Sequence, residues 1–518
     1  MPATGRLPDD KIKDPKKTED ETQPNSPIQA SSSAGKQQFP VGEQASDTAA
    51  DQQSFVNKTQ AIQAHLQQFS DQNLYSGIVL IQKGPNKKIM PFGKTITNTP
   101  ISENTMMRIG SVTKLFTDTA IKELIHMTKH TAQEITFQTT IDKILPNSLI
   151  PDDRRASKIT ISQLLTHTSG IAKEINSWDT LMHSKTDTSL TDLVKLAMET
   201  PLDFEPGTID ERGNPKFSYS NLGYSILAYV IGHTYKQITN QTDISIDDAY
   251  KAFISNAVFK KLEMENTGFI DDFTFAEQEN SRGLRFNESG ETNPVARNNL
   301  SPVKGSGNMF SSALDLLNFM RSDMARNQLP KGPKLYHLEG FGHAGAISGA
   351  CTMVFTYKNP ELQDYNKDED TTIICLSNRG DPHADLLHRD VTAIAMDIDS
   401  QKVVPIDPNV KDFSTALYEK FTGAYAFTVA NHPMQNIITT KDSILFIEYR
   451  QTFDDKTPQK RPNLRLAPVS LTENDQEFDY KFLDPGLNEI HMIVDKTTGN
   501  VSLDRFLIGF KERWEKMG

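Results

Sequence analysis

The residue pair in this sequence that best suits nucleophilic chemistry is Ser111 with Lys114. The pattern Ser-x-x-Lys occurs three times, starting at Ser33, Ser111 and Ser301. Only Ser111 is followed directly by apolar residues at helical spacing, and residues three apart share one face of a helix. A lysine beside a serine hydroxyl lowers the cost of forming the alkoxide, or acts as its base when desolvation removes its proton. The start of a helix also offers a free backbone N–H to an oxyanion.

Other catalytic patterns in the sequence are weaker. Ser33 lies in a polar, proline-rich stretch, and a proline and two glycines follow Ser301, so a helix is expected at neither serine. The sequence contains no Gly-x-Ser-x-Gly and no His-Glu-x-x-His. His126 and His130 are four residues apart on an expected helix. Because no glutamate lies between them to act as a base, we interpret them as part of a solvated face.

Five segments occur in an order that is typical of one enzyme family. They are RIGSVTK at 108–114, ITISQLLTHTSG at 159–170, EPGT at 205–208, FSYSNLGY at 217–224 and GHAG at 342–345. In this order the sequence resembles the β-lactamase-related serine hydrolases, which include class C β-lactamases, D,D-peptidases, D-aminopeptidases and related esterases. The resemblance covers roughly residues 60–400.

The resemblance implies three catalytic residues. Ser111 matches the nucleophile that becomes acylated, and Lys114 matches its partner. Tyr219, in the Tyr-Ser-Asn segment, matches the tyrosine that exchanges protons with the nucleophile and the leaving group. No metal or organic cofactor is implied.

The resemblance also implies four residues that bind the substrate. Asn221 matches the asparagine that bonds the substrate amide and positions the lysine. His343 matches the first residue of the Lys-Thr-Gly strand motif. Gly345 suits that strand, since a side chain there is expected to block pairing with the substrate backbone. The amide of Ala346 is expected to bind the oxyanion together with that of Ser111.

The third motif departs from the β-lactamase pattern, because it is His-Ala-Gly and lacks both the hydroxyl and the fixed cation of Lys-Thr-Gly. This departure weakens an assignment as a β-lactamase, since those two groups hold the carboxylate of the drug. An imidazole has an unperturbed pKa of about 6.5. We therefore expect His343 to bind a substrate carboxylate well below about pH 6 and weakly above about pH 7.5.

Each of these residues also has a purely structural interpretation. Tyr219 alone fits a half-buried packing residue, Asn221 a helix cap, and His343 a loop histidine. The order of the motifs favours the site interpretation for all three. His167, in the 159–170 segment, is expected to hold a turn, and the 205–208 segment is expected to shape a loop.

The resemblance and the apolar patterns together imply an α/β fold. We expect an antiparallel sheet flanked by helices, with an all-helical lobe inserted between the Ser111 helix and Tyr219. The expected strands are 74–84, 87–94, 350–357 and 371–378, and the expected helices include 61–69, the segment from Ser111 onward, and 383–398.

The composition changes along the chain and predicts four parts. Residues 1–55 form a polar tail, since the first 50 contain six prolines and only six Leu, Ile, Val, Met or Phe. Residues 56–400 form the hydrolase domain. A linker at 401–410 leads to a small antiparallel β domain at 411–518, either a barrel or a sandwich. This last part loosely resembles the lipocalin-like modules attached to several such hydrolases.

The overall composition excludes several classes of protein. The chain has 55 Lys and Arg against 67 Asp and Glu, a net charge of −12, which argues against a nucleic-acid partner. No apolar stretch approaches 18 residues, so no transmembrane helix is expected. Cys351 and Cys375 are too few for a disulfide framework, and we expect two buried thiols, with one cross-strand bridge as the alternative. The start of the sequence lacks a Sec signal, which favours a cytoplasmic protein or another export route.

These observations favour a serine hydrolase that forms an acyl-enzyme with a small or peptide-like amide or ester. Two alternatives remain. One is a true β-lactamase or penicillin-binding D,D-peptidase. The other is a binding or assembly protein with an idle site. The sequence predicts neither the natural substrate nor the oligomeric state.

Overall fold

The computed structural model describes most of the chain from Ala49 onward. The described residues are 49–71, 75–151, 155–173, 178–210, 213–272, 283–286, 292–294, 299–328, 339–347, 349–359, 361–362, 364–379, 384–397, 420–429, 432–441, 444–451, 459–460, 464–473, 477–483, 489–498, 501–507 and 510–516. Most of the expected tail, with Ser33, and the whole expected linker at 401–410 lie outside the described residues.

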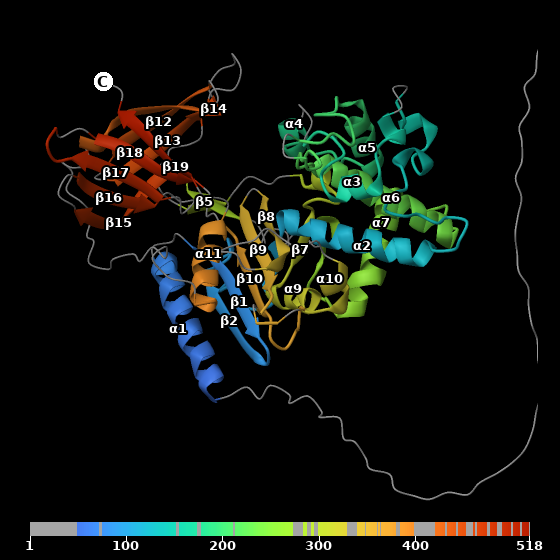
Figure 1. The fold of residues 1–518 in the computed structure, drawn as a ribbon, viewed down its shortest axis with the longest axis horizontal. Coiled ribbons are helices and arrows are strands. Elements are labelled where there is room, and N and C mark those ends of the chain that lie inside the picture. Colours follow the sequence, from blue (N-terminus) through green and yellow to red (C-terminus); the bar gives the residue numbers. More distant parts are fainter. Residues whose placement is uncertain are drawn as a thin grey trace, which may run out of the picture. The chain divides into compact units, whose positions relative to one another are not determined.

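A five-stranded antiparallel sheet lies at the centre of the motif-bearing part of the chain (Figure 1). The strand order is β2-β1-β10-β9-β8, and the bounds are β1 Gly77–Lys83, β2 Asn86–Phe92, β8 Gly340–Ile347, β9 Ala350–Tyr357 and β10 Thr371–Ser377. All four pairings are antiparallel. The four predicted strands are confirmed as β1, β2, β9 and β10. β8 is an edge strand, and it carries the His-Ala-Gly motif.

Both faces of this sheet are buried. Successive side chains of a strand point to opposite faces, so each strand contributes to two apolar cores. In β1, Ile78 and Leu80 join one apolar core, whereas Val79 and Ile81 join another. The second core is covered by α1 (Ala49–Asp71) and α11 (Ala384–Ala395), which Figure 1 shows on the same side of the sheet. Central strands buried on both sides read as continuous apolar runs, which is why the sequence predicted them well.

Helix α1 begins earlier than the sequence indicated. Residues 49–55, which we assigned to the tail, form its first turns. These turns expose their side chains, apart from a half-buried Phe55. They therefore carry almost none of the apolar periodicity that marked 61–69 as a helix.

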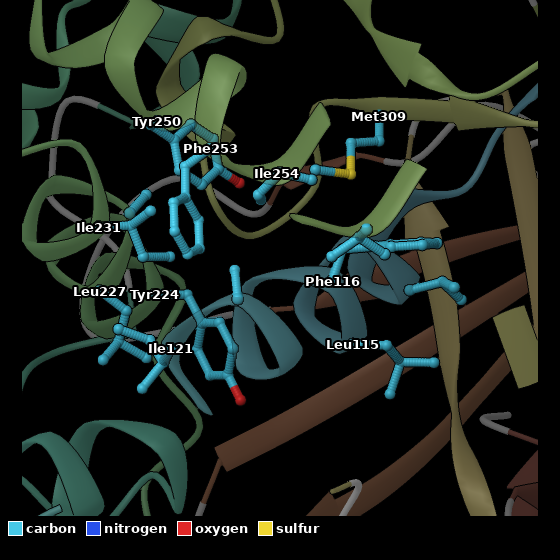
Figure 2. Packing of buried hydrophobic residues seen from close by; sticks show 14 of the residues in the cluster. Leu115, Phe116, Ile121, Tyr224, Leu227, Ile231, Tyr250, Phe253, Ile254 and Met309 are labelled. Atoms are coloured by element: carbon cyan, nitrogen blue, oxygen red, sulfur yellow. The ribbon is translucent and has the colours of Figure 1, made fainter. Parts of the chain in front are cut away.

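Helices cover the other face of the sheet and form the lobe that follows the Ser111 segment. Their bounds are α2 Thr113–Thr128, α3 Ile161–Leu165, α4 Trp178–Met182, α5 Leu190–Glu199, α6 Asn221–Thr239, α7 Ile246–Ile254, α9 Ala313–Met320 and α10 Asp323–Gln328. Side chains cap several of them, as at α5, where Ser189 Oγ accepts from the Asp192 amide at 3.1 Å. Figure 2 shows the apolar contact of α2, α6 and α7, built by Phe116, Ile121, Tyr224, Leu227, Ile231, Phe253 and Ile254.

Short strands form two further small sheets. β3 (Met107–Arg108) and β4 (Gly268–Phe269) pair with β7 (Met309–Ser311), and β5 (Leu284–Phe286) pairs with β6 (Thr292–Pro294). β3 leads directly into the Ser111 segment, so its pairing fixes where that segment starts.

The C-terminal segment consists of antiparallel strands. Their bounds are β11 Gly423–Val429, β12 His432–Lys441, β13 Ile444–Gln451, β14 Gln459–Lys460, β15 Leu464–Glu473, β16 Glu477–Leu483, β17 Glu489–Asp495, β18 Val501–Leu507 and β19 Phe510–Lys516. The order is β12-β11-β19-β18-β17-β16-β15-β13-β14, and β12 also pairs with β13. Starting at β11, the pairings run through β19, β18, β17, β16, β15, β13 and β12 and return to β11.

The two cysteines lie buried on neighbouring strands, Cys351 on β9 and Cys375 on β10, and no disulfide joins them. Burial raises the pKa of the Cys375 thiol to about 12. Within the described residues, no helix is both long and apolar enough to cross a membrane.

The contact between α6 and α7 gives a test of this packing. A Cβ on Gly232 of α6 would lie 2.3 Å from the carbonyl oxygen of Ile246. Gly→Ala inside a helix normally stabilises by about 0.5–1 kcal/mol. Here we expect Gly232→Ala to destabilise by about 1–3 kcal/mol, because the two helices must move apart. Gly223→Ala in the same helix is the control, since its Cβ would first meet a side-chain atom, Ser220 Oγ, at 3.3 Å. Equal melting temperatures for both variants would contradict the close approach.

Candidate active site

Ser111 lies in a 3-10 turn, Gly110–Val112, that runs directly into α2. Gly110 has a φ of 48°, which a residue without Cβ adopts at low cost. Lys114 is in the first turn of α2, and its Nζ donates to Ser111 Oγ at 3.2 Å. The predicted arrangement of Ser111 and Lys114 on one face is therefore confirmed.

The Lys114 side chain is almost fully buried, with 1% of its surface exposed. An ammonium has three N–H donors, and a buried charge is costly unless these are satisfied. Besides Ser111 Oγ, the Nζ donates to Asn221 Oδ1 at 2.8 Å and to the Ser306 carbonyl at 3.0 Å. The three acceptors come from three separate segments of the chain.

Tyr219 lies on the opposite side of the serine hydroxyl. Its OH donates to Ser111 Oγ at 2.9 Å, so the hydroxyl lies between a phenol and an ammonium. Lys114 Nζ is also 4.8 Å from the centre of the Tyr219 ring and 5.4 Å from that of Tyr224. A cation over an aromatic face is attractive, so the two rings help to hold the buried charge.

His167 supports the segment that carries Tyr219. Its backbone has a φ of 57°, in keeping with the predicted turn. Its Nδ1 accepts from the Ser220 amide at 3.0 Å, and its ring centre lies 4.5 Å from that of Tyr219. Burial, and then the charge of Lys114, lower the pKa of His167 to about 3. The imidazole is therefore neutral at neutral pH, and Nδ1 keeps the lone pair that accepts this bond.

Strand β8 packs closely against the Ser111 turn. A Cβ on Gly345 would lie 2.1 Å from the Ile109 carbonyl oxygen and 3.0 Å from the Ser111 amide nitrogen. A Cβ on Gly110 would lie 3.1 Å from the Ala346 amide nitrogen. The amides of Ser111 and Ala346 are thus brought near one another. A glycine at 345 is therefore needed because a side chain would collide with the Ser111 turn. This reason differs from the one that we expected, which was pairing with the substrate backbone.

His343 is half-buried on β8, and its ring centre is 6.5 Å from that of Tyr219. Its Nδ1 bonds the Ala344 carbonyl. Burial, and next the charge of Lys114, lower its pKa to about 4, although the bond to Ala344 acts in the opposite direction. Our expectation that the imidazole loses its charge between about pH 6 and 7.5 is therefore wrong. The sequence did not indicate the burial of the imidazole, which is the main cause of the lowered pKa.

The other residues that the sequence suggested for catalysis lie outside the site around Ser111. Ser301 Oγ accepts from the Thr188 amide at 2.8 Å, and Lys304 forms ion pairs, so this third Ser-x-x-Lys is no nucleophile pair. His126 and His130 are exposed, and α2 ends before His130. Among the described residues, no cluster of His, Cys, Asp or Glu suits a metal ion.

One contributor to the site gave no signal in the sequence. Ser306 contacts Lys114 through its backbone carbonyl, which every residue type possesses. A backbone acceptor can be found only from the path of the chain.

The sequence profile described as Beta-lactamase matches residues 62–395, more than half of the chain, and the chain therefore belongs to this family. Protein flp of Staphylococcus aureus (strain COL) is 31% identical over 170 residues, which are 32% of this chain and 29% of that protein. Penicillin-binding protein 4 of Amycolatopsis lactamdurans is 29% identical over 135 residues, which are 26% of this chain and 31% of that protein. The matches span less than a third of the length of these curated relatives.

Solved structures show the same fold. The octameric penicillin-binding protein homologue from Pyrococcus abyssi has a TM-score of 0.52 and 15% identity, covering 88% of this chain and 100% of that chain. The D-amino acid amidase from Ochrobactrum anthropi SV3, complexed with L-phenylalanine, has a TM-score of 0.50 and 16% identity, covering 66% of this chain and 98% of that chain. At these identities the likeness concerns the fold alone.

The lowered pKa of His343 predicts how substrate binding depends on pH. A group with a pKa of about 4 is neutral from pH 6 to 8. The ratio of KM for a carboxylate-bearing ester to KM for a matched neutral ester should therefore be constant over this range. In His343→Lys we expect a several-fold lower KM for the anionic ester only, because a charge-assisted bond exceeds a neutral one by about 1 kcal/mol. A ratio that rises between pH 6 and 7.5 in the wild type would contradict this assignment.

Proposed function

We propose that the protein is a serine hydrolase that cleaves an amide or ester through an acyl-enzyme on Ser111. The observation that carries this proposal is the position of Ser111 Oγ, 3.2 Å from Lys114 Nζ and 2.9 Å from the Tyr219 hydroxyl. A nucleophilic serine needs a group that takes its proton, and these two side chains are within reach. Membership of the Beta-lactamase family supports the same reaction class.

In the proposed reaction, Tyr219 acts as the phenolate, and the Lys114 ammonium stabilises the alkoxide of Ser111. Ser111 Oγ attacks the substrate carbonyl carbon while its proton passes to the Tyr219 oxygen. The amides of Ser111 and Ala346 stabilise the resulting oxyanion. Tyr219 then gives the proton to the leaving nitrogen or oxygen, and the bond to that atom breaks. Water attacks the acyl-enzyme by the reverse proton path, releasing the acid and restoring the Ser111 hydroxyl.

We assign substrate binding to Asn221, His343, Gly345 and Ala346. Asn221 has an amide NH₂ besides the oxygen that Lys114 uses, so the side chain can hold the ammonium and bond a substrate carbonyl. Among the described strands, β8 pairs with β9 alone, and Gly345 of β8 faces the Ser111 turn. We propose that a peptide-like substrate extends along the other edge of β8. A neutral His343 serves there as a hydrogen-bonding group.

Two other functions are separable by experiment. A β-lactamase or D,D-peptidase is favoured by the likeness to penicillin-binding protein 4. It is disfavoured by a neutral His343, which supplies no fixed cation for a carboxylate. Turnover of a chromogenic cephalosporin distinguishes this function from that of an esterase or amidase. An idle site is distinguished by its failure to react with an acyl probe.

We expect a fluorophosphonate to modify Ser111 and no other serine. Ser301 is the internal control, since it has the same Ser-x-x-Lys spacing but its lysine is engaged by Asp187 and Asp247. Peptide mapping by mass spectrometry should place the adduct on Ser111, and both Ser111→Ala and Lys114→Met should abolish labelling. An adduct on Ser301, or labelling that survives Ser111→Ala, would refute the assignment.

We further propose that the hydrolase domain begins with α1 at Ala49 and extends to about residue 400, preceded by a polar tail and followed by a linker and a separate β module at 411–518. The pairing of β12 with both β11 and β13 supports a closed barrel, because it leaves only the short β14 outside the ring. An up-and-down order of neighbouring strands is typical of such barrels.

A separate module should fold on its own. Residues 411–518 expressed alone are expected to give a β-type circular dichroism spectrum and a cooperative thermal transition. The fragment 49–400, which keeps α1 whole, is the matched control, and it should keep its labelling by the acyl probe. A fragment 411–518 without a cooperative transition would show that these strands depend on the rest of the chain.

A further inference from the structure

The turn that follows Ser301 presents three successive carbonyl groups to side chains of α2 and α6. The three bonds run from Ser225 Oγ to the Lys304 carbonyl at 2.9 Å, from Thr117 Oγ1 to the Gly305 carbonyl at 2.8 Å, and from Lys114 Nζ to the Ser306 carbonyl at 3.0 Å. The position of the Ser306 carbonyl, and with it one of the three acceptors of Lys114, therefore depends on where this turn lies.

The same turn is held from the other side by the Lys304 side chain. Lys304 Nζ is 2.8 Å from Asp187 Oδ2 and 2.7 Å from Asp247 Oδ1, and its side chain is only 4% exposed. Burial lowers the pKa of Lys304, but the bonds to the two carboxylates outweigh it and raise the pKa, so the ion pairs persist at neutral pH. Lys304 is three residues after Ser301, as Lys114 is three residues after Ser111. Lys304, however, forms ion pairs with two carboxylates, whereas Lys114 bonds its serine.

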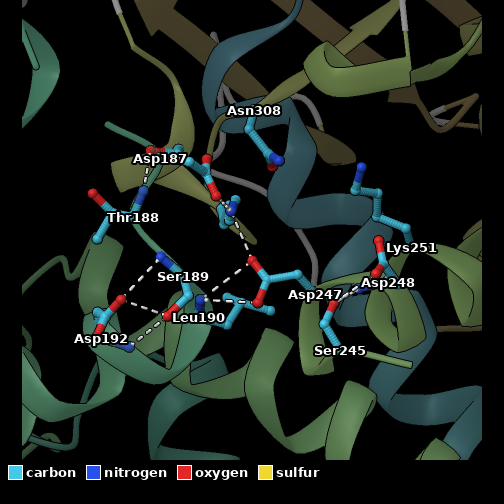
Figure 3. A network of polar contacts seen from close by, with 12 residues as sticks. Asp187, Thr188, Ser189, Leu190, Asp192, Ser245, Asp247, Asp248, Lys251 and Asn308 are labelled. Carbon is cyan, nitrogen blue, oxygen red and sulfur yellow. Dashed lines mark hydrogen bonds and ion pairs between the residues drawn. The ribbon is translucent and has the colours of Figure 1, made fainter. Parts of the chain in front are cut away.

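The two carboxylates tie Lys304 to α7 and to the segment that leads into α5. Asp247 is in the first turn of α7, and it also accepts from the Leu190 amide at the start of α5, at 3.1 Å (Figure 3). Asp187 lies in the segment before α5. The Lys304 ammonium therefore anchors the turn to two helices of the lobe.

Close packing leaves the turn little freedom to adjust. Gly305 has a φ of 81°, and a Cβ there would lie 2.5 Å from the Tyr224 carbonyl oxygen. Ser306 is 1% exposed. If Lys304 loses its charge, the Asp247 carboxylate, which is 16% exposed, remains uncompensated beside a buried turn, and the turn must shift to let water reach it.

We propose that Lys304 is a positioning residue, which holds the Ser306 carbonyl where it fixes the Lys114 ammonium against Ser111. This inference rests on the proposed function, in which the Lys114 ammonium stabilises the alkoxide that Ser111 forms. Lys304 does not touch the reacting atoms, and it acts through the backbone of residues 304–306. A side-chain substitution at Ser306 leaves the carbonyl in place, so Lys304 is the position at which this dependence can be tested.

The test compares Lys304→Met, Lys304→Arg and Lys251→Met in the full chain. Lys251 is the matched control: it lies on α7, one turn after Asp247, and pairs with Asp272 at 3.2 Å, away from the turn. The readouts are kcat and KM for p-nitrophenyl butyrate and the second-order rate of fluorophosphonate labelling. Circular dichroism at the assay temperature reports the folded fraction.

We expect Lys304→Met to lower kcat and the labelling rate about 10- to 100-fold, because a shift of about 1 Å at a reacting group has effects of this size. KM should change by less than about threefold, since the substrate contacts remain. Lys304→Arg should recover most of the rate, as it keeps both ion pairs. Lys251→Met should leave kcat within about twofold whatever its melting temperature.

The inference is overturned if the Lys304→Met variant is folded and labels at the wild-type rate. It is also overturned if Lys251→Met lowers kcat as much as Lys304→Met does. If Lys304→Met does not fold, Asp187→Asn decides, since Asp187 is 65% exposed and its loss breaks one of the two pairs. A wild-type rate in that variant counts against the inference, and a several-fold loss in kcat at constant KM supports it. Failure of the wild type itself to label contradicts the proposed function instead, so the two failures are distinguishable.

Discussion

The buried ammonium of Lys114 is the constraint on which the rest of the site depends. Its three donors are matched by a serine hydroxyl, an asparagine side chain and a backbone carbonyl. Leaving one donor of a buried charged group without an acceptor costs about 1–3 kcal/mol or more. The start of α2, the start of α6 and the turn at 304–306 must therefore meet at one point. Burial, and next the Lys114 charge, lower the pKa of His167 and of His343, so both imidazoles are neutral at neutral pH.

A second requirement is the close approach of β8 to the turn that carries Ser111. Two glycines without side chains, Gly110 and Gly345, make this approach sterically feasible. The sheet therefore does more than support the helices, because its edge strand brings the Ala346 amide beside the nucleophile. The helical lobe and the edge strand of the sheet both supply groups around Ser111, so the nucleophile lies where the two meet.

Much of this arrangement was predictable from the sequence. Ser111 and Lys114 were identified because their spacing matches a helical turn, and β9 and β10 because apolar strands buried on both faces read as continuous runs. The exposed first turns of α1 were missed, because they carry no apolar pattern. The Ser306 carbonyl, the ion pairs of Lys304 and the lowered pKa of His343 were also missed. They arise from contacts between residues that are far apart in the chain, and no local pattern encodes such contacts.

The most direct test of this account is a high-resolution crystal structure of the protein carrying a phosphonate on Ser111. The account predicts that Lys114 Nζ stays within hydrogen-bond distance of Ser111 Oγ, Asn221 Oδ1 and the Ser306 carbonyl. It also predicts that the phosphonyl oxygen accepts from the amides of Ser111 and Ala346. A Lys114 side chain that turns away from Ser111, or a phosphonyl oxygen that points to solvent, would contradict it.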